Sequence, residues 1–176
     1  MKFIKTPLKD AYIVEVEKRG DDRGFFGRSF CLDEFEKAGI EFTVKQANVS
    51  RSTQKGTLRG LHYQKAPHQE DKLIRCTKGA IFDVILDLRP ESPTYKQWFG
   101  AELTEDNHKA MLCPKGFAHG QISLTDNSEI TYLVSEFYTP GVESGIRWND
   151  PMFKIQWPLK PVEISQKDAN WPDFTS

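Results

Sequence analysis

The stretch Gly56–Gln64 reads GTLRGLHYQ and places an arginine, a histidine, a tyrosine and an amide in an otherwise apolar alternation. The period of two predicts a β-strand. In a regular strand Arg59 and His62 would point to opposite faces, unless the strand is bulged or sharply bent at Gly60. The alternative is an edge strand with a surface arginine and a histidine that only satisfies local hydrogen bonds.

Strand-like runs separated by turn residues continue on both sides of this stretch. We predict further strands at 11–17, 25–30, 42–50, 72–76, 80–88, 98–103, 109–113, 119–124 and 130–137. One short helix is expected at 33–38, closed by Gly39, and another near the end of the chain. Many short strands with so few helices indicate an all-β sandwich or barrel. A jelly roll of one domain, residues 1–176, suits this pattern, because two packed sheets leave a mouth that polar side chains can line.

The charge balance argues against a nucleic-acid partner. The 176 residues carry 24 basic and 25 acidic side chains, which gives a net charge of -1. Nucleic-acid binding needs a concentrated basic face, and no such excess exists here. A local group of basic residues that holds a small anion remains compatible with these numbers.

The cysteines and the N-terminus indicate a cytoplasmic protein. Cys31, Cys76 and Cys113 are an odd number with no CxxC spacing, so we expect reduced thiols, with Cys76 and Cys113 in the core. The first residues contain no apolar signal core, and no run is long enough to cross a membrane.

The segment Pro114–His119 (PKGFAH) resembles the second motif of the cupin superfamily. In that superfamily the first motif supplies two histidines at HxH spacing and a glutamate, which bind a metal together with the histidine of the second motif. Here Gln64 stands two residues after His62, and the nearby His68 and Glu70 do not have the required spacing. We therefore expect no catalytic metal, and a metal-dependent cupin is an alternative that metal analysis would identify.

Seven motifs together resemble one family. They are DDRGFF (21–26), QANVS (46–50), LRGLHYQ (58–64), KLIRC (72–76), PKGFAHG (114–120), WNDP (148–151) and SQKD (165–168). They stand in the order seen in the dTDP-4-dehydrorhamnose 3,5-epimerases. The resemblance implies a cupin-like jelly roll (double-stranded β-helix), a homodimer and no metal or organic cofactor. It also implies a substrate that is a nucleotide-diphosphate-linked 4-keto-6-deoxy sugar, inverted at C3, at C5 or at both through an enolate.

By this resemblance four residues are catalytic. His62 is the base, Asp168 holds its other ring nitrogen, Lys72 stabilises the enolate, and Tyr132 is the acid on the opposite face of the sugar. Taken alone, Tyr132 reads as a half-buried strand tyrosine and Asp168 as a turn or helix cap. The positions that the resemblance assigns to substrate binding are Arg23, Phe26, Arg28, Gln46, Asn48, Arg59, His119, Tyr138 and Glu143. The neighbouring subunit would contribute Arg23 and Phe26 to the nucleotide end of the site.

Arg28 departs from the family pattern, which commonly has a glutamate at this position close to the base. Thymine offers an N–H donor to an acidic side chain, whereas the donor fork of arginine suits the acceptors of cytosine or guanine. The nucleotide is therefore open between dTDP, CDP and GDP. The sequence also leaves open whether C3, C5 or both are inverted. The alternative from another class is a non-catalytic cupin that binds sugar nucleotides.

Overall fold

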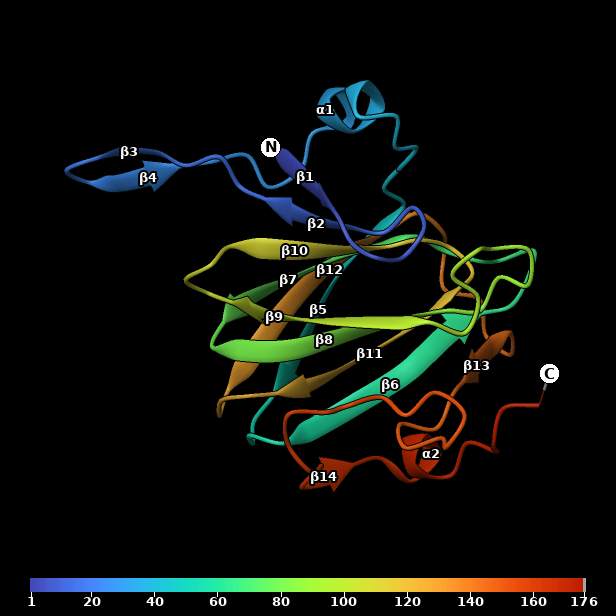
Figure 1. The fold of residues 1–176 in the computed structure, drawn as a ribbon. Helices are drawn as coiled ribbons and strands as arrows, with labels where there is room; N and C mark the ends of the chain where they lie inside the picture. The colour runs from blue at the N-terminus through green and yellow to red at the C-terminus, as the bar shows by residue number, and fades with distance from the viewer. Residues whose placement is uncertain (176) are drawn as a thin grey trace.

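The computed structural model describes residues 1–175 and consists of two facing antiparallel sheets (Figure 1). The first sheet has the order β1 (Lys2–Lys5), β2 (Tyr12–Glu15), β10 (Lys109–Cys113), β7 (Lys72–Lys78), β12 (Ser128–Val134) and β5 (Gln46–Ser52). The second has the order β13 (Glu143–Gly145), β6 (Thr57–Gln64), β11 (Phe117–Ser123), β8 (Ala80–Asp87) and β9 (Trp98–Thr104). The short β14 (Glu163–Ile164) pairs in parallel with β6. This architecture confirms the predicted jelly roll.

The central core lies between the two sheets, where alternate residues of each strand meet. Ile74 and Met111 of the first sheet pack with Ile81, Ile85 and Leu103 of the second in one buried cluster. Cys76 and Cys113 belong to the same cluster, which confirms their predicted place in the core. The period of two in these strands therefore has its physical cause in a shared apolar interior.

The outer faces of both sheets are also covered. Helix α1 (Leu32–Lys37) buries Phe35 against the first sheet, and Gly39 follows it with φ +74, so the predicted helix and its glycine stop are confirmed. The C-terminal segment covers the second sheet and contains the one-turn helix α2 (Gln166–Ala169). No helix in residues 1–175 is both long and apolar enough to cross a membrane.

Several predicted strands differ from their expected bounds, and the strand predicted at 11–17 is confined to Tyr12–Glu15. The strand predicted at 25–30 ends at Phe26, and the strand predicted at 42–50 begins at Gln46. The cause is that Phe30 and Phe42 instead pack with Phe35 on the outer face of the first sheet. The strand predicted at 130–137 ends at Val134. Four strands were not predicted, namely β1, β3 (Arg19–Asp21), β13 and β14, which are too short to show a clear alternation.

A hairpin of β3 (Arg19–Asp21) and β4 (Gly24–Phe26) projects away from the sheets (Figure 1). All six of its strand residues are exposed, including Phe26 at 67% of its accessible area. A hairpin of this size does not bury enough surface to be stable alone, and an exposed phenylalanine at its end is typical of a contact surface.

Candidate active site

A cavity of about 450 Å³ opens between the two sheets. It is lined by Arg59, His62, His119 and Gln121 of the second sheet, Ser50, Lys72, Ile130 and Tyr132 of the first, and Glu163, Ser165, Lys167 and Asp168 of the C-terminal segment. A second cavity of similar volume adds Gln46, Asn48, Gln64, Glu70, Tyr138 and Glu143. The two cavities share His62, Lys72 and Tyr132, so these three predicted catalytic residues lie where the cavities meet.

The bend considered at Gly60 is present and brings Arg59 and His62 to the same cavity. The pairing of β6 with β11 shifts register between His119 and Gln121. Gly60 has φ +109, and a Cβ atom at this position would lie 2.6 Å from the Cα atom of Gly120. Only glycine suits such a backbone. The irregularity at Gly60 interrupts the alternation of side chains along β6, so Arg59 and His62 face the same cavity.

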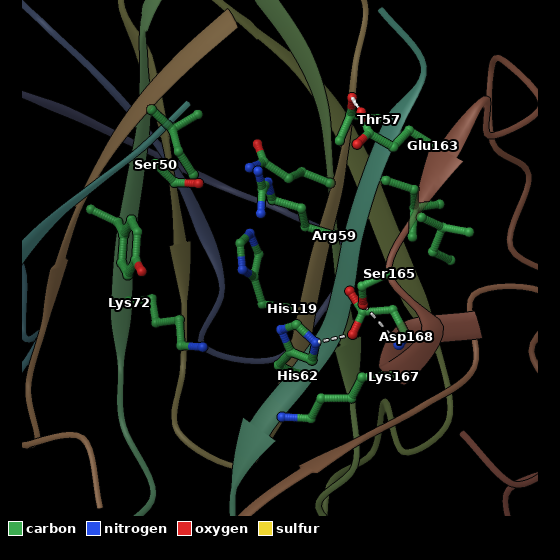
Figure 2. A pocket seen from close by; sticks show the side chains of 15 residues that line it. Ser50, Thr57, Arg59, His62, Lys72, His119, Glu163, Ser165, Lys167 and Asp168 are labelled. Carbon is green, nitrogen blue, oxygen red and sulfur yellow. Dashed lines mark hydrogen bonds and ion pairs between the residues drawn. The ribbon is translucent and has the colours of Figure 1, made fainter. Parts of the chain in front are cut away.

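His62 and Asp168 form a hydrogen-bonded pair on the cavity wall (Figure 2). His62 Nε2 lies 2.6 Å from Asp168 Oδ1, and the Gly60 N–H donates to Asp168 Oδ2 at 3.1 Å. Burial alone would raise the pKa of Asp168, but the hydrogen bonds from His62, from the Gly60 N–H and from Ser165 lower it below its ordinary value. An ionised carboxylate only accepts, so Nε2 carries a proton and Nδ1 is the ring nitrogen free to take one.

Asp168 is not the helix cap that its position alone would suggest. Ser165 is the N-cap of α2, and its Oγ accepts the backbone N–H of Asp168 at 3.1 Å. The Asp168 side chain turns away from the helix into the site, where it is 6% exposed. The cap therefore fixes the backbone of α2 and leaves the carboxylate free to hold His62.

Lys72 is held by a chain of polar contacts that begins at Gln64. The Lys72 Nζ atom lies 3.0 Å from Glu70 Oε1, and the Gln64 Nε2 donates to Glu70 Oε2 at 3.2 Å. Gln64 Oε1 accepts the Thr139 N–H at 2.8 Å, which ties the two loops beside the second cavity to β6. Gln64, which stands where the cupin motif has a metal ligand, therefore joins Glu70 and Thr139 through hydrogen bonds of its side-chain amide. Among residues 1–175 no three histidine, cysteine or acidic side chains are grouped to hold a metal.

Tyr132 faces this space from the opposite sheet. It lies on β12, directly across from Asn48 on β5, and packs against the central apolar core. It is half-buried, as expected of a strand tyrosine, and it also lines both cavities. A molecule bound between the sheets would therefore meet His62 from one side and Tyr132 from the other.

The remaining predicted residues divide into two groups. Gln46, Asn48, Arg59, His119, Tyr138 and Glu143 line one of the two cavities. Arg23, Phe26 and Arg28 line neither cavity. Arg23 pairs with Asp21 on the projecting hairpin, and Arg28 Nη1 lies 3.0 Å from Glu34 Oε1.

Lys167 is a cavity residue that the sequence analysis did not assign. It lies at the cavity mouth beside His62 and Asp168 (Figure 2) and forms an ion pair with Glu143, which lines the second cavity. The pair therefore connects α2 to β13 across the boundary of the two cavities. Its signal was present in the SQKD motif at 165–168, where only the aspartate received a role.

The comparisons with known proteins agree along the whole chain. A family model described as dTDP-4-dehydrorhamnose 3,5-epimerase matches residues 5–176. A dTDP-4-dehydrorhamnose 3,5-epimerase of Shigella flexneri is 43% identical over 175 residues, which cover 99% of this chain and 96% of the relative.

Two solved structures have the same fold. The Bacillus anthracis dTDP-4-dehydrorhamnose 3,5-epimerase with TDP and PPi bound superposes with a TM-score of 0.95 at 45% identity, covering 98% of this chain and 99% of that one. The Legionella pneumophila dTDP-6-deoxy-D-glucose-3,5-epimerase in complex with dTDP-4-keto-L-rhamnose superposes with a TM-score of 0.89 at 40% identity, covering 96% of this chain and 89% of that one.

Proposed function

We propose a reaction path for this chain from the premise that it belongs to the dTDP-4-dehydrorhamnose 3,5-epimerase family. The chain is a nucleotide-sugar epimerase that inverts C3, C5 or both in a nucleotide-linked 4-keto-6-deoxyhexose. The observation that supports the residue roles is that His62 and Tyr132 face one space from opposite sheets, with Lys72 lining the same space.

The reaction requires stabilisation of an enolate. Hydrogens on C3 and C5 are both α to the C4 ketone, so either can be removed and returned on the other face. An imidazole is more than about ten pK units weaker than the base that it must generate, a gap that costs upwards of ~14 kcal/mol at about 1.36 kcal/mol per unit. Preorganised donors at the C4 oxygen must therefore supply most of the catalysis.

His62 takes the proton from carbon at its Nδ1 atom. Its Nε2 proton is already committed to Asp168, which fixes the ring and stabilises the imidazolium that forms. Lys72 supplies a positive charge towards the C4 oxygen, and Glu70 holds the Lys72 ammonium in place before the substrate arrives. The Tyr132 hydroxyl then returns a proton from the opposite face, which inverts the carbon.

The diphosphate and the sugar divide between the two cavities. Arg59 is held towards β5 by bonds to Ser52 Oγ at 3.2 Å and to the Arg51 carbonyl at 3.1 Å, and its fork suits phosphate oxygens. Arg59 therefore meets the diphosphate, while Lys72 stays at the C4 oxygen. Gln46, Asn48, His119, Tyr138 and Glu143 line the remainder of the substrate site.

The nucleotide end of the site is completed by a second subunit. The projecting hairpin carries Arg23 and Phe26 away from the cavities of their own chain, with the Arg23 side chain 89% exposed. An exposed arginine and phenylalanine on one hairpin offer a charge for phosphate and a ring for a base. In a homodimer with twofold symmetry each hairpin would reach the cavity of its partner.

The test is turnover of a defined substrate. The purified protein is incubated with dTDP-linked 4-keto-6-deoxyglucose, and the ring configuration of the product is determined by NMR. We expect inversion at C3, C5 or both in the wild type and none with His62→Ala. A protein that binds the sugar nucleotide without changing its configuration would instead be a binding cupin.

A further inference from the structure

A second histidine–aspartate pair lies beside the first. His119 Nε2 lies 2.7 Å from Asp83 Oδ1, and His119 stands directly opposite His62 in the pairing of β11 with β6. Both rings line the same cavity, as Figure 2 shows. The two pairs therefore have the same connection, with Nε2 on the carboxylate, and they differ in what surrounds the carboxylates.

The two carboxylates receive different numbers of hydrogen bonds. Asp168 accepts from the Gly60 N–H as well as from His62. Asp83 is 0% exposed, and its Oδ2 atom has no partner in the described part of the chain. Gln121 is directly across from Asp83 in the strand pairing, yet it also presents a buried oxygen without a partner and donates nothing to Asp83.

This difference decides where the compensating charge must be. A buried carboxylate is costly unless donors or an opposite charge satisfy it. Backbone donation at Asp168 reduces that need, so His62 can remain a neutral base. Within residues 1–175 the Asp83 carboxylate has a side-chain hydrogen bond from His119 alone, so we assign the compensating charge to the His119 ring. A charged imidazole carries protons on both nitrogens, which leaves an Nδ1–H directed away from Asp83.

The other charges around the cavity permit this arrangement. Arg59 and Lys72 line the same cavity as His119 and oppose a further positive charge there. Glu70 Oε1 forms an ion pair with Lys72 Nζ at 3.0 Å. Glu163 adds a further acidic side chain on the cavity wall formed by the C-terminal segment. Lys167 at the mouth is paired with Glu143. Arg59 is thus the cation of this lining that has no acidic partner within residues 1–175. A charged His119 must tolerate the positive charge of Arg59.

We propose that Asp83 is a positioning residue that keeps His119 as an N–H donor towards the substrate, so that two similar pairs perform opposite tasks. His62 accepts the proton that leaves carbon, while His119 keeps its protons and donates a hydrogen bond to the C4 oxygen as that oxygen gains negative charge. Different environments around two groups of one type are a general way to obtain an acid and a base. This inference rests on the proposed function and adds a donor to Lys72.

The first test needs no substrate. Ring nitrogen NMR on protein labelled with ¹⁵N-histidine separates protonated from unprotonated nitrogens, and His119→Gln assigns the His119 signals. At neutral pH we expect both His119 nitrogens protonated and His62 protonated at Nε2 alone. Asp83→Asn should turn His119 neutral and leave the His62 signals unchanged. A neutral His119 in the wild type would overturn the proposal.

The second test separates catalysis from binding. Asp83→Asn keeps the shape of the side chain, and we expect kcat to fall about 10²–10³-fold, the loss typical of one oxyanion donor, with KM near the wild-type value. His119→Gln should lose as much, and the double variant no more than either one. Unchanged kcat in a folded single variant, or fully additive losses, would contradict the assignment. A wild type without any turnover would refute the proposed function, and the NMR result would still decide the charge of His119.

Discussion

His62 Nε2 and Asp168 Oδ1 are 2.6 Å apart although 106 residues separate them in the sequence. The connection depends on the C-terminal segment, which pairs β14 with β6 and places α2 beside β6 (Figure 1), so that Asp168 lines the cavity. The base therefore lies on a strand of the second sheet, and the residue that orients it lies near the C-terminal end of the chain. Docking of the C-terminal segment is therefore what brings the Asp168 carboxylate to His62.

Asp168 is expected to couple stability to pH. Its pKa is lowered in the folded protein, so its stabilising contribution is fully present above the ordinary value of 3.8 and is lost as pH falls through the lower folded pKa. Asp168→Asn should therefore destabilise the protein at neutral pH, and the difference from wild type should shrink as the pH falls below 3.8. Urea unfolding of both proteins at several pH values measures this. A constant difference across that range would contradict the pairing.

Gly60→Ala should disturb both the fold and the site. An added Cβ would meet the Gly120 Cα and the His119 carbonyl oxygen, each at 2.6 Å, in a backbone with positive φ. Gly39→Ala is the matched control, because Gly39 also has positive φ but has open space around it. The control should lose roughly 1–2 kcal/mol from the backbone conformation alone, and Gly60→Ala clearly more. Equal losses in denaturant unfolding would exclude the close approach as the cause.

Shared sites predict recovery of activity between two inactive variants. His62→Ala removes the base, and Arg23→Ala removes the residue proposed to reach the partner's site. When the two are mixed as unfolded chains and refolded, half of the dimers are mixed and each has one intact site. About a quarter of wild-type activity should therefore return, given twofold symmetry. If each site uses only its own chain, the mixture would show no gain over the variants refolded separately.

Arg28 is the position at which base preference can be tested. We hypothesise that it reads an acceptor-rich base, which requires its guanidinium to leave Glu34. The measurement compares kcat/KM for dTDP-, CDP- and GDP-linked 4-keto-6-deoxyglucose in the wild type and in Arg28→Glu. We expect Arg28→Glu to shift the preference towards dTDP at least tenfold. A wild type that already prefers dTDP, with a ranking unchanged in the variant, would leave Arg28 as an ion-pair partner of Glu34 only.

The fold could be predicted because alternation along strands such as β8 follows directly from burial on one side. Strand ends were less predictable where an aromatic residue had a competing place. Phe42 continues the apolar pattern of β5 in sequence but packs below α1 with Phe35 instead. The local sequence pattern cannot tell whether such a phenylalanine extends a strand or packs against a helix, because the helix comes into contact with it only in the folded protein.

The residues of the candidate site could be predicted where they belong to a recognised motif. They could not be predicted where their role depends on a side-chain contact between different strands. His62, Lys72 and Tyr132 lie together at the junction of the cavities, as their motifs implied. Asp83 received no role because it sits in the apolar run of β8, and its partner His119 is 36 residues away. Glu70 had been considered only as a metal ligand at the wrong spacing, whereas its structural contact is Lys72.

The central claim is that a base and an acid act on one enolate from opposite faces. Its most direct test is solvent deuterium incorporation at C3 and C5 of the sugar nucleotide in deuterated water, followed by NMR for the wild type and Tyr132→Phe. We predict inverted, deuterated product from the wild type. With Tyr132→Phe, we predict exchange with little inversion, because His62 still forms the enolate and can return deuterium only to the original face. Inverted product without deuterium in the wild type, or full inversion by Tyr132→Phe, would contradict the account.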